Sequence, residues 1–350
     1  MSKELTALYR KYRPSTFTEV IGQDNIVKTL EGALKLRNIF HAYLFAGSRG
    51  TGKTTLARIV AHEIGATGND IYEIDAASNN GVDEMRIINE AVSTLPFESP
   101  YKVYIFDEVH MFSKSAWNAL LKTLEEPPAH VVFILATTEI EKVPETILSR
   151  CQVFSLKKPT REILRQSVTA VAKKEGFALE AGAGELIALL GDGSFRDSQG
   201  ILQKVISATK DKKISLSEVE MVTGAPRGEL VNRFITSLET KKLDEAISHL
   251  HQALRANVDA KVFIRLALQK LRFVLLLRYA PEMEKELADE VSGEDLAFLK
   301  KVATSKSPTT DGISSTLLSE LLSAYDASGR AYISALPIEL ALIRVFGGEK

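Results

Sequence analysis

Short apolar runs alternate with segments of helical spacing over roughly the first half of the chain. The apolar runs are typical of buried strands, and the segments between them have apolar residues recurring every three or four positions, which indicates helices. The predicted strands cover residues 42–46, 70–75, 102–108 and 131–138. The predicted helices cover residues 24–36, 55–64 and 82–94. Alternating strands and helices predict an α/β domain with a mostly parallel sheet, covered by helices on both faces.

The pattern changes at Pro159, after which helical spacing dominates. Short helices are expected at residues 161–174, 184–190, 196–209 and 217–223. Residues 227–346 are almost wholly helical by pattern, with one apolar stripe formed by Ile264, Leu268, Leu271 and Leu275. The next predicted helix covers residues 337–346, and the Ser- and Thr-rich stretch at 304–316 predicts a loop.

Length and composition are those of a globular protein with more than one domain. A chain of 350 residues is expected to form two or three domains. The pattern divides it into an α/β domain at 1–158, a small helical domain at 159–223 and an all-helical domain at 224–350. The net charge of −1 excludes a wholesale basic coat, so any nucleic-acid contact would need a local patch.

Cysteine content and apolar runs restrict the expected compartment. Cys151 is the single cysteine, so an intrachain disulfide framework or a cysteine-rich zinc site is impossible. This favours a reducing compartment. The first residues lack the apolar core of a signal peptide, and the longest apolar runs are too short to span a membrane. We therefore expect a cytoplasmic location and no membrane partner.

A glycine-rich stretch between the first predicted strand and the next helix carries the clearest chemistry. Residues 47–54 fit the phosphate-binding pattern G-x-x-x-x-G-K-[ST]. Glycines let backbone N–H groups approach phosphate, and the helix N-terminus adds partial positive charge. Lys53 is predicted to reach the outer phosphates, and the Thr54 hydroxyl to ligate Mg²⁺. The predicted nucleotide-binding residues here are Gly47, Ser48, Arg49, Gly50, Thr51, Gly52, Lys53, Thr54 and Thr55. The alternative, a glycine-rich turn that binds nothing, does not need a lysine and a threonine after its last glycine.

Two carboxylates end the predicted strand at 102–108. Asp107 and Glu108 are expected at the carboxyl end of a parallel strand, which is where ligands lie in α/β sheets. Asp107 is placed to hold the Mg²⁺ shell, and Glu108 to polarise an attacking water as a general base. The alternative is a strand that simply ends in exposed acids. The phosphate-binding loop earlier in the chain weighs against that alternative.

Three further segments each allow two interpretations. Thr137 and Thr138 end the strand at 131–138, and could sense the γ-phosphate or hold the water, or be ordinary β-branched strand residues. Arg150 could complete a neighbouring subunit's site as an arginine finger, or only be solvated. The basic and aromatic cluster at 9–14 could stack on a base. Composition alone favours a solvated basic arm whose aromatic side chains pack in the core.

Several short strings in the chain are typical of one family. They are Tyr12-Arg13-Pro14, Val20-Ile21-Gly22-Gln23, His41-Ala42-Tyr43-Leu44-Phe45, the loop at 47–54, Glu73-Ile74-Asp75-Ala76-Ala77-Ser78, Asp107-Glu108-Val109-His110-Met111, Leu120-Leu121-Lys122-Thr123-Leu124-Glu125-Glu126-Pro127-Pro128, Leu135-Ala136-Thr137-Thr138 and Ser149-Arg150-Cys151. Through them the chain resembles the AAA+ ATPases of the clamp-loader kind, and among these the gamma/tau subunits of bacterial DNA polymerase III. The resemblance is dense over residues 5–200 and looser at 336–343.

The resemblance implies a fold, an activity and partners. The three predicted domains would be an AAA+ P-loop ATPase domain, a helical lid domain and a helical oligomerisation (collar) domain. The chain would be an ATP-hydrolysing, Mg²⁺-dependent motor subunit that opens a sliding clamp and loads it onto primed DNA in replication. Its partners would be delta- and delta-prime-type subunits, further copies of itself, the sliding clamp and primer–template DNA. No polymerase active site is expected, so a polymerase label would come from the holoenzyme alone.

The resemblance also implies roles for individual residues. Thr138 falls at the first sensor position, Arg150 at the finger that acts on the neighbouring subunit's ATP, and Arg196 at the second sensor. Catalysis is therefore expected from Glu108, Lys53, Thr138, Arg150 (in trans) and Arg196. The residues that fall where the family packs adenine are Tyr9, Arg10, Pro14, Val20, Ile21 and Gln23. The residues that fall near surfaces facing DNA in related loaders are Asn79, Arg86 and Lys114.

The chain departs from the family pattern in two places. A cysteine-rich zinc module usually lies between the loop helix and the second strand, but residues 63–69 span that gap here without a cysteine. We therefore expect no zinc. The sequence also ends at Lys350, soon after the third predicted domain, without the long tail by which tau-like forms tether the polymerase and helicase. This predicts a gamma-like short form or a truncated one.

Two alternative functions remain open from the sequence. A non-hydrolysing structural subunit of the same ring, like delta-prime, often has a degraded loop, so the intact Gly52-Lys53-Thr54 and Asp107-Glu108 strings argue against it. Another AAA+ DNA-remodelling motor, such as a branch-migration helicase motor, is the second. The strings at 124–128 and 149–151 favour a loader instead.

Overall fold

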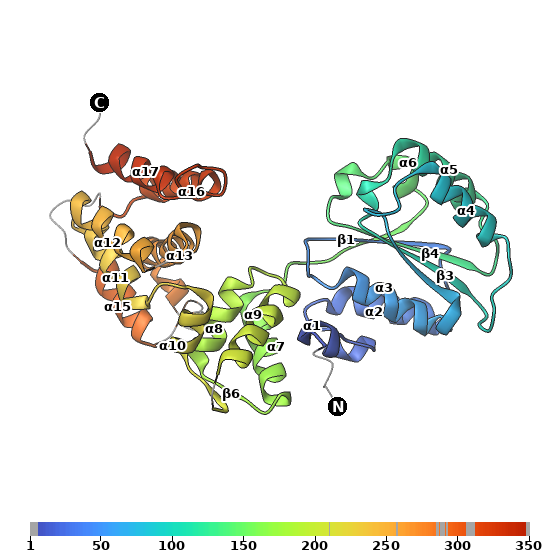
Figure 1. The fold of residues 1–350 in the computed structure, drawn as a ribbon, viewed down its shortest axis with the longest axis horizontal. Coiled ribbons are helices and arrows are strands. Elements are labelled where there is room, and N and C mark those ends of the chain that lie inside the picture. Colours follow the sequence, from blue (N-terminus) through green and yellow to red (C-terminus); the bar gives the residue numbers. More distant parts are fainter. Residues whose placement is uncertain are drawn as a thin grey trace. The chain divides into compact units, whose positions relative to one another are not determined.

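The chain forms two compact units. The computed structural model describes residues 6–209, 211–256, 258–284, 287, 291, 293–305 and 312–347 (Figure 1). One unit comprises Met1–Ser167 with Gly191–Gly200, and the other Val168–Leu190 with Ile201–Lys350. The predicted three-domain boundaries stay a prediction.

A five-stranded parallel sheet forms the centre of the first unit (Figure 1). Its strands are β1 (Ala42–Ala46), β2 (Ile71–Asp75), β3 (Lys102–Asp107), β4 (Val131–Thr137) and β5 (Gln152–Ser155). The strand order is β2-β3-β4-β1-β5, so β4 lies between β3 and β1. Because the strands are parallel, the segments that follow β1, β3 and β4 leave the sheet at one edge. The predicted parallel sheet is confirmed.

Side chains of the central strands alternate between two cores, one on each face of the sheet. In β3, Tyr104 and Phe106 enter one core, whereas Val103 and Ile105 enter the other. Burial on both faces explains why these strands are apolar throughout their length and do not alternate with polar residues.

Helices cover both faces of the sheet (Figure 1). In chain order the helical elements of this part are α1 (Leu8–Lys11), η1 (Phe17–Glu19), α2 (Asp24–Lys35), α3 (Lys53–Glu63), η2 (Gly68–Asp70), α4 (Val82–Val92), η3 (Val109–Met111), α5 (Lys114–Glu125), η4 (Ile140–Lys142) and α6 (Glu145–Leu148). Leu30 of α2 and Ile59 of α3 pack on one face. Met85 of α4 and Trp117 of α5 pack on the other. The helices therefore supply the burial that an all-parallel sheet requires.

Every strand and helix predicted for this unit is present, with ends that shift by at most two residues. Helix α5 and strand β5 are among the elements that were not predicted. Helix α5 begins after Ser113, whose Oγ accepts a 3.1 Å hydrogen bond from the N–H of Ala116 and so caps the helix. Strand β5 lies at the sheet edge and is only four residues long, so it lacks the apolar run that reveals the other strands.

The part of the chain after β5 is mainly helical. Its helices are α7 (Arg161–Lys174), α8 (Ala181–Leu190), α9 (Phe195–Ala208), α10 (Leu216–Thr223), α11 (Gly228–Glu239), α12 (Leu243–Arg255), α13 (Ala260–Tyr279), η5 (Pro281–Met283), α15 (Gly293–Ala303), α16 (Ser315–Ser328) and α17 (Leu336–Phe346). A two-stranded parallel sheet of β6 (Ala178–Leu179) and β7 (Lys213–Ile214) was not predicted, because two-residue strands leave no periodic signal.

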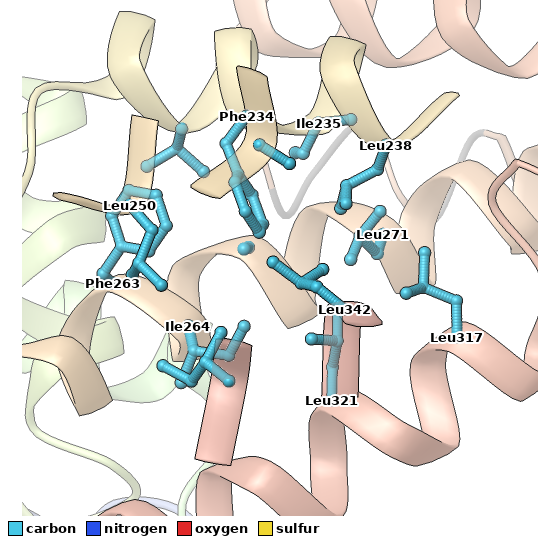
Figure 2. Packing of buried hydrophobic residues seen from close by; sticks show 14 of the residues in the cluster. Phe234, Ile235, Leu238, Leu250, Phe263, Ile264, Leu271, Leu317, Leu321 and Leu342 are labelled. Atoms are coloured by element: carbon cyan, nitrogen blue, oxygen red, sulfur yellow. The ribbon is translucent and has the colours of Figure 1, made fainter. Parts of the chain in front are cut away.

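A third core joins helices from α11 to α17 (Figure 2). The rings of Phe234 and Phe263 meet edge to face, with centroids 5.1 Å apart. Ile264 and Leu271 of the predicted apolar stripe are fully buried in this core. The loop predicted at 304–316 follows α15, but residues 306–311 lie outside the described residues. Among the described helices, none is long and apolar enough to cross a membrane.

Candidate active site

The glycine-rich loop links β1 to α3 and is preformed for a close backbone approach. Gly50 and Gly52 have φ of +74° and +108°, which are left-handed conformations that favour glycine. A Cβ on Gly50 would also collide with the Ser194 side chain. Thr51 Oγ1 donates a 2.9 Å hydrogen bond to Ser48 O and closes the loop. Helix α3 starts directly at Lys53, so its first backbone N–H groups face a loop able to hold an anion.

The Lys53 side chain lies inside this loop. It is only 5% exposed, and its Nζ donates hydrogen bonds of 2.8 and 3.1 Å to the carbonyl oxygens of Gly47 and Ser48. Burial lowers the pKa of Lys53, while the carboxylates of Glu108 and Asp107 act in the opposite direction. A buried ammonium in a glycine loop at a helix start fits a phosphate ligand.

Thr54 and Asp107 join the loop helix to the end of β3. Thr54 Oγ1 donates a 2.8 Å hydrogen bond to Asp107 Oδ2, and Asp107 Oδ1 accepts one of 3.0 Å from the N–H of Glu108. A hydroxyl and a carboxylate are oxygen ligands of the kind that Mg²⁺ takes, and Mg²⁺ usually adds phosphate oxygens and water. Within the described part of the chain, no group of three or more His, Cys, Asp or Glu could hold a metal ion. The expected absence of zinc stays a prediction.

Glu108 and Thr138 meet at the ends of two neighbouring strands. Glu108 Oε2 accepts hydrogen bonds from the Thr138 hydroxyl at 2.9 Å and from the Thr138 N–H at 3.2 Å. Glu108 has φ of +52°, a left-handed conformation that is unfavourable for a residue with a Cβ. The structure therefore brings together the residues predicted as general base and first sensor.

The start of α9 lies against the phosphate-binding loop. The N–H of Phe195 donates a 3.0 Å hydrogen bond to Gly50 O, and the next residue, Arg196, places its guanidinium 5.7 Å from the centre of the Tyr9 ring. The Arg196 charge also contributes to lowering the pKa of Lys53, after the effect of burial. Residues predicted as second sensor and adenine contact thus adjoin the loop.

The guanidinium group of Arg13, inside the stretch 9–14 that falls where the family packs adenine, lies near those of Arg58 and Arg196. Burial lowers the pKa of Arg13, and the charges of Arg58 and Arg196 lower it further. Arg58 forms an ion pair with Glu73, with 2.5 Å between Nε and Oε1. In the part of the chain that the structure describes, Glu73 is the only carboxylate paired with these three guanidinium groups, which leaves an excess of positive charge that suits a polyphosphate. Arg13 lies inside the basic cluster at 9–14, and this cluster is the sequence feature that points to it.

The remaining residues predicted for adenine lie on the segment before α2. Gln23 is buried, and its side-chain amide makes hydrogen bonds of 2.7 and 3.1 Å with the backbone O and N–H of Lys157. Val20 packs on the sheet core and Ile21 is exposed, while Pro14 is half-buried and Arg10 is exposed. Gln23 therefore anchors this segment to the chain after β5, and adenine contact stays a prediction.

Arg150 follows α6, at the surface. Its Nη2 lies 2.6 Å from Glu125 Oε1 at the end of α5, and its Nη1 donates a 2.6 Å hydrogen bond to Thr146 O. Its side chain is 32% exposed. The ion pair with Glu125 was not predicted. The contact with Glu125 does not test whether Arg150 acts on a neighbouring subunit's ATP, so that role stays a prediction.

The residues predicted to face DNA lie on segments that follow β2 and β3. Asn79 Nδ2 donates a 3.0 Å hydrogen bond to Asp75 O, and Arg86 on α4 pairs with Asp83 at 3.1 Å. Lys114 is the exposed first residue of α5. The N–H of Ser113 bonds to Asn80 O at 3.1 Å, which links the loop of Asn79 to the start of α5. Contact with DNA stays a prediction.

Together, the loop after β1, the carboxylates after β3 and the threonine after β4 define an AAA+ P-loop fold. The solved Holliday junction branch migration motor RuvB of Thermotoga maritima shares this fold, with a TM-score of 0.53. The two are 23% identical, and the match covers 74% of this chain and 91% of RuvB.

Sequence relatives narrow the class to one family. The chain belongs to the DNA polymerase III gamma/tau family. It is 39% identical over 260 residues to subunit gamma of Buchnera aphidicola subsp. Schizaphis graminum, covering 67% of this chain and 71% of that protein. It is 41% identical over 299 residues to subunit tau of Bacillus subtilis, covering 79% of this chain and 53% of tau.

The extent of these matches differs between relatives. A family model described as DNA polymerase III, delta subunit, matches residues 65–160. The chain spans about half the length of the Bacillus tau subunit (53%), and 34% and 60% of two Mycoplasma gamma/tau subunits.

Proposed function

We propose that this chain is an ATP-hydrolysing motor subunit of the bacterial DNA polymerase III clamp loader. The observation that carries the proposal is a pair of hydrogen bonds, Thr54 to Asp107 and Thr138 to Glu108. They join the phosphate-binding loop, the predicted metal ligand, the predicted base and the predicted sensor across three neighbouring strands. Membership of the gamma/tau family supports the same conclusion.

Nucleotide binding is assigned to the loop and the start of α3. Backbone N–H groups and the partial positive charge of the helix start hold the phosphates, and Lys53 bonds to the outer ones. The Arg196 guanidinium, fixed beside the loop by the bond between Phe195 and Gly50, adds positive charge on the other side of the site. Tyr9 and the segment at 20–23 are assigned to the base.

Hydrolysis is assigned to Glu108. Its carboxylate accepts a proton from the attacking water, and Thr138 holds one of its oxygens in place. Mg²⁺, held by Thr54 and Asp107, would supply charge neutralisation on the outer phosphates. Arg150 of an adjacent subunit would add a further positive charge to the γ-phosphate.

The process that ATP hydrolysis would drive is inferred from membership of the gamma/tau family. The chain would assemble in the cytoplasm with further copies of itself and with delta- and delta-prime-type subunits. The assembly would open the sliding clamp and place it on primer–template DNA. Asn79, Arg86 and Lys114 are the residues proposed to face the DNA.

The test is an ATPase assay with and without partner subunits, clamp and primed DNA. We expect wild type to hydrolyse ATP and to be stimulated by the full set. The Lys53→Ala variant should lose binding and turnover, because it lacks the charge on the outer phosphates, whereas Lys35→Ala on the surface of α2 should match wild type. A chain that binds ATP without hydrolysing it in any mixture would be a structural subunit instead. Stimulation by branched DNA without a clamp would indicate another DNA-remodelling motor.

A further inference from the structure

His110 lies directly beside the proposed base, although it was not among the predicted site residues. It belongs to η3, the turn that follows Glu108, and its side chain is only 9% exposed. Its Nδ1 is 3.1 Å from Thr137 Oγ1 and 3.4 Å from Glu108 Oε2. The available sequence signal was a histidine two residues after Glu108.

The opposite edge of the His110 ring is fixed by a second carboxylate. Its Nε2 is 3.2 Å from Glu139 Oε1, and when the ring carries a proton on each nitrogen its two edges donate to the two carboxylates. Glu139 is held in turn by Lys142, at 2.7 Å, and its own N–H donates a 3.0 Å hydrogen bond to Thr137 Oγ1. The ring is therefore oriented from both ends.

Three groups consequently surround a single oxygen of the base. Glu108 Oε2 is contacted by the hydroxyl and the N–H of Thr138 and by the Nδ1 edge of His110. Thr138 lies at the end of β4, whereas His110 lies on η3, so the two approach from different elements. Contacts from two elements fix the rotation of a carboxylate better than contacts from one, because each removes a different torsional freedom.

We propose that His110 is a positioning residue for Glu108, itself oriented by Glu139. The inference rests on the proposed function, in which Glu108 is the general base. His110 does not touch the nucleotide. It keeps Oε2 against Thr138 and so leaves Oε1 as the oxygen that accepts the proton of the attacking water. Its loss frees the carboxylate to rotate away from that arrangement, which lowers turnover and leaves nucleotide affinity in place.

Two amide substitutions separate positioning from a structural role. Asparagine places its amide near the position of Nδ1, beside Glu108, while the longer glutamine places it near Nε2, beside Glu139. We expect His110→Gln to lower kcat about tenfold, the scale of one hydrogen bond to a charged group, with KM for ATP unchanged. His110→Asn should retain most of the wild-type kcat. The same pair at His130, which contacts Thr94 O at 3.1 Å, is the matched control and should change neither constant.

The melting temperature and the binding of a fluorescent ATP analogue are measured for every variant. Loss of kcat in the Gln variant and its rescue in the Asn variant, at similar melting temperatures, supports the inference. Equal kcat in both variants, whether impaired or normal, overturns it, as does a change confined to KM. If either variant fails to fold, Glu139→Ala replaces it, and an unchanged kcat there also overturns the inference. In the same assay, wild type that hydrolyses no more ATP than Lys53→Ala would instead refute the proposed function.

Discussion

The backbone N–H of Phe195 donates a 3.0 Å hydrogen bond to the carbonyl oxygen of Gly50. One residue of α9 thereby touches the phosphate-binding loop, and the next, Arg196, is placed beside it. Ser194 fills the space where a Cβ on Gly50 would lie, so the two segments fit closely. A conformational change in the phosphate-binding loop is therefore expected to move Arg196. A shift of the start of α9 is likewise expected to move the loop.

Arg196→Ala is expected to weaken ATP binding about tenfold or more, because a guanidinium contributes strong hydrogen bonds to phosphate. The bond between Phe195 and Gly50 uses backbone atoms and should persist. Titration of a fluorescent ATP analogue would measure the effect. Lys204→Ala, an exposed position on the same helix, is the control and should bind like wild type. Equal affinity for the Arg196 variant and this control would remove Arg196 from the site.

Glu108→Gln is expected to retain ATP binding and to lower hydrolysis on the order of 10²-fold or more, the scale of general-base catalysis. Glutamine can still accept the hydrogen bonds of Thr138, but it cannot take a proton from water. Single-turnover hydrolysis and equilibrium binding should be measured on the same preparation. Loss of binding equal to the loss of hydrolysis would show that Glu108 has a structural or metal-binding role instead.

Arg150→Ala is expected to leave binding by the isolated chain unchanged and to reduce clamp- and DNA-stimulated hydrolysis in the assembly. In assemblies that mix wild-type and variant subunits, the variant should silence its neighbour's site and spare its own. Glu125→Gln is a useful companion, because it removes the acidic partner that holds the guanidinium at 2.6 Å. Failure of the variant's own site, with the neighbour still active, would place Arg150 in cis.

Asp70→Asn is expected to destabilise the first unit in a pH-dependent manner. Burial raises the pKa of Asp70, but hydrogen bonds from the N–H groups of Glu98, Phe97 and Ser99 outweigh it and bring the pKa below its ordinary value of 3.8. A lowered pKa in the folded state means that ionised Asp70 contributes stability above the ordinary carboxyl pKa. That contribution is lost as the pH falls through the lowered pKa.

The measurement is the free energy of unfolding of wild type and Asp70→Asn between neutral pH and pH values below 3.8. The difference between the two proteins should be largest at neutral pH and should shrink as Asp70 takes up its proton. Asp83→Asn, an exposed carboxylate on α4, serves as the control. A difference in the free energy of unfolding that stays constant across the pH range would mean that the charge of Asp70 does not stabilise the segment at 97–99.

The elements predicted from the sequence were those with strong local signals. The buried strands were predicted from their apolar runs. The phosphate-binding loop was predicted from its motif, whose glycines adopt a left-handed backbone that other residues avoid. Strand β5 escaped prediction because an edge strand needs few apolar residues, and its pairing with β1 is a long-range property. The pattern also placed Thr138 and Glu108 at strand ends, but their hydrogen bonds depend on β3 and β4 being neighbours.

Side-chain partners were the least predictable part of the site. Gln23 was expected at the base of the nucleotide, yet its amide bonds to the backbone of Lys157, which lies 134 positions away in the chain. The ion pair between Arg150 and Glu125 and the contacts of His110 likewise join separate segments. Local sequence patterns carry no record of such pairs, because the pairing is decided by the packing of elements.

The left-handed backbone of Glu108 has an evolutionary consequence. At φ of +52° a residue with a Cβ costs about 1–2 kcal/mol, which glycine would avoid. If Glu108 is the general base, as proposed, selection for turnover would retain a carboxylate at a position where the backbone conformation favours glycine. A lineage that abandoned hydrolysis would be free to drift at this position and would become sturdier by doing so. On this proposal, the carboxylate lowers the stability of the fold and would persist only while hydrolysis is under selection.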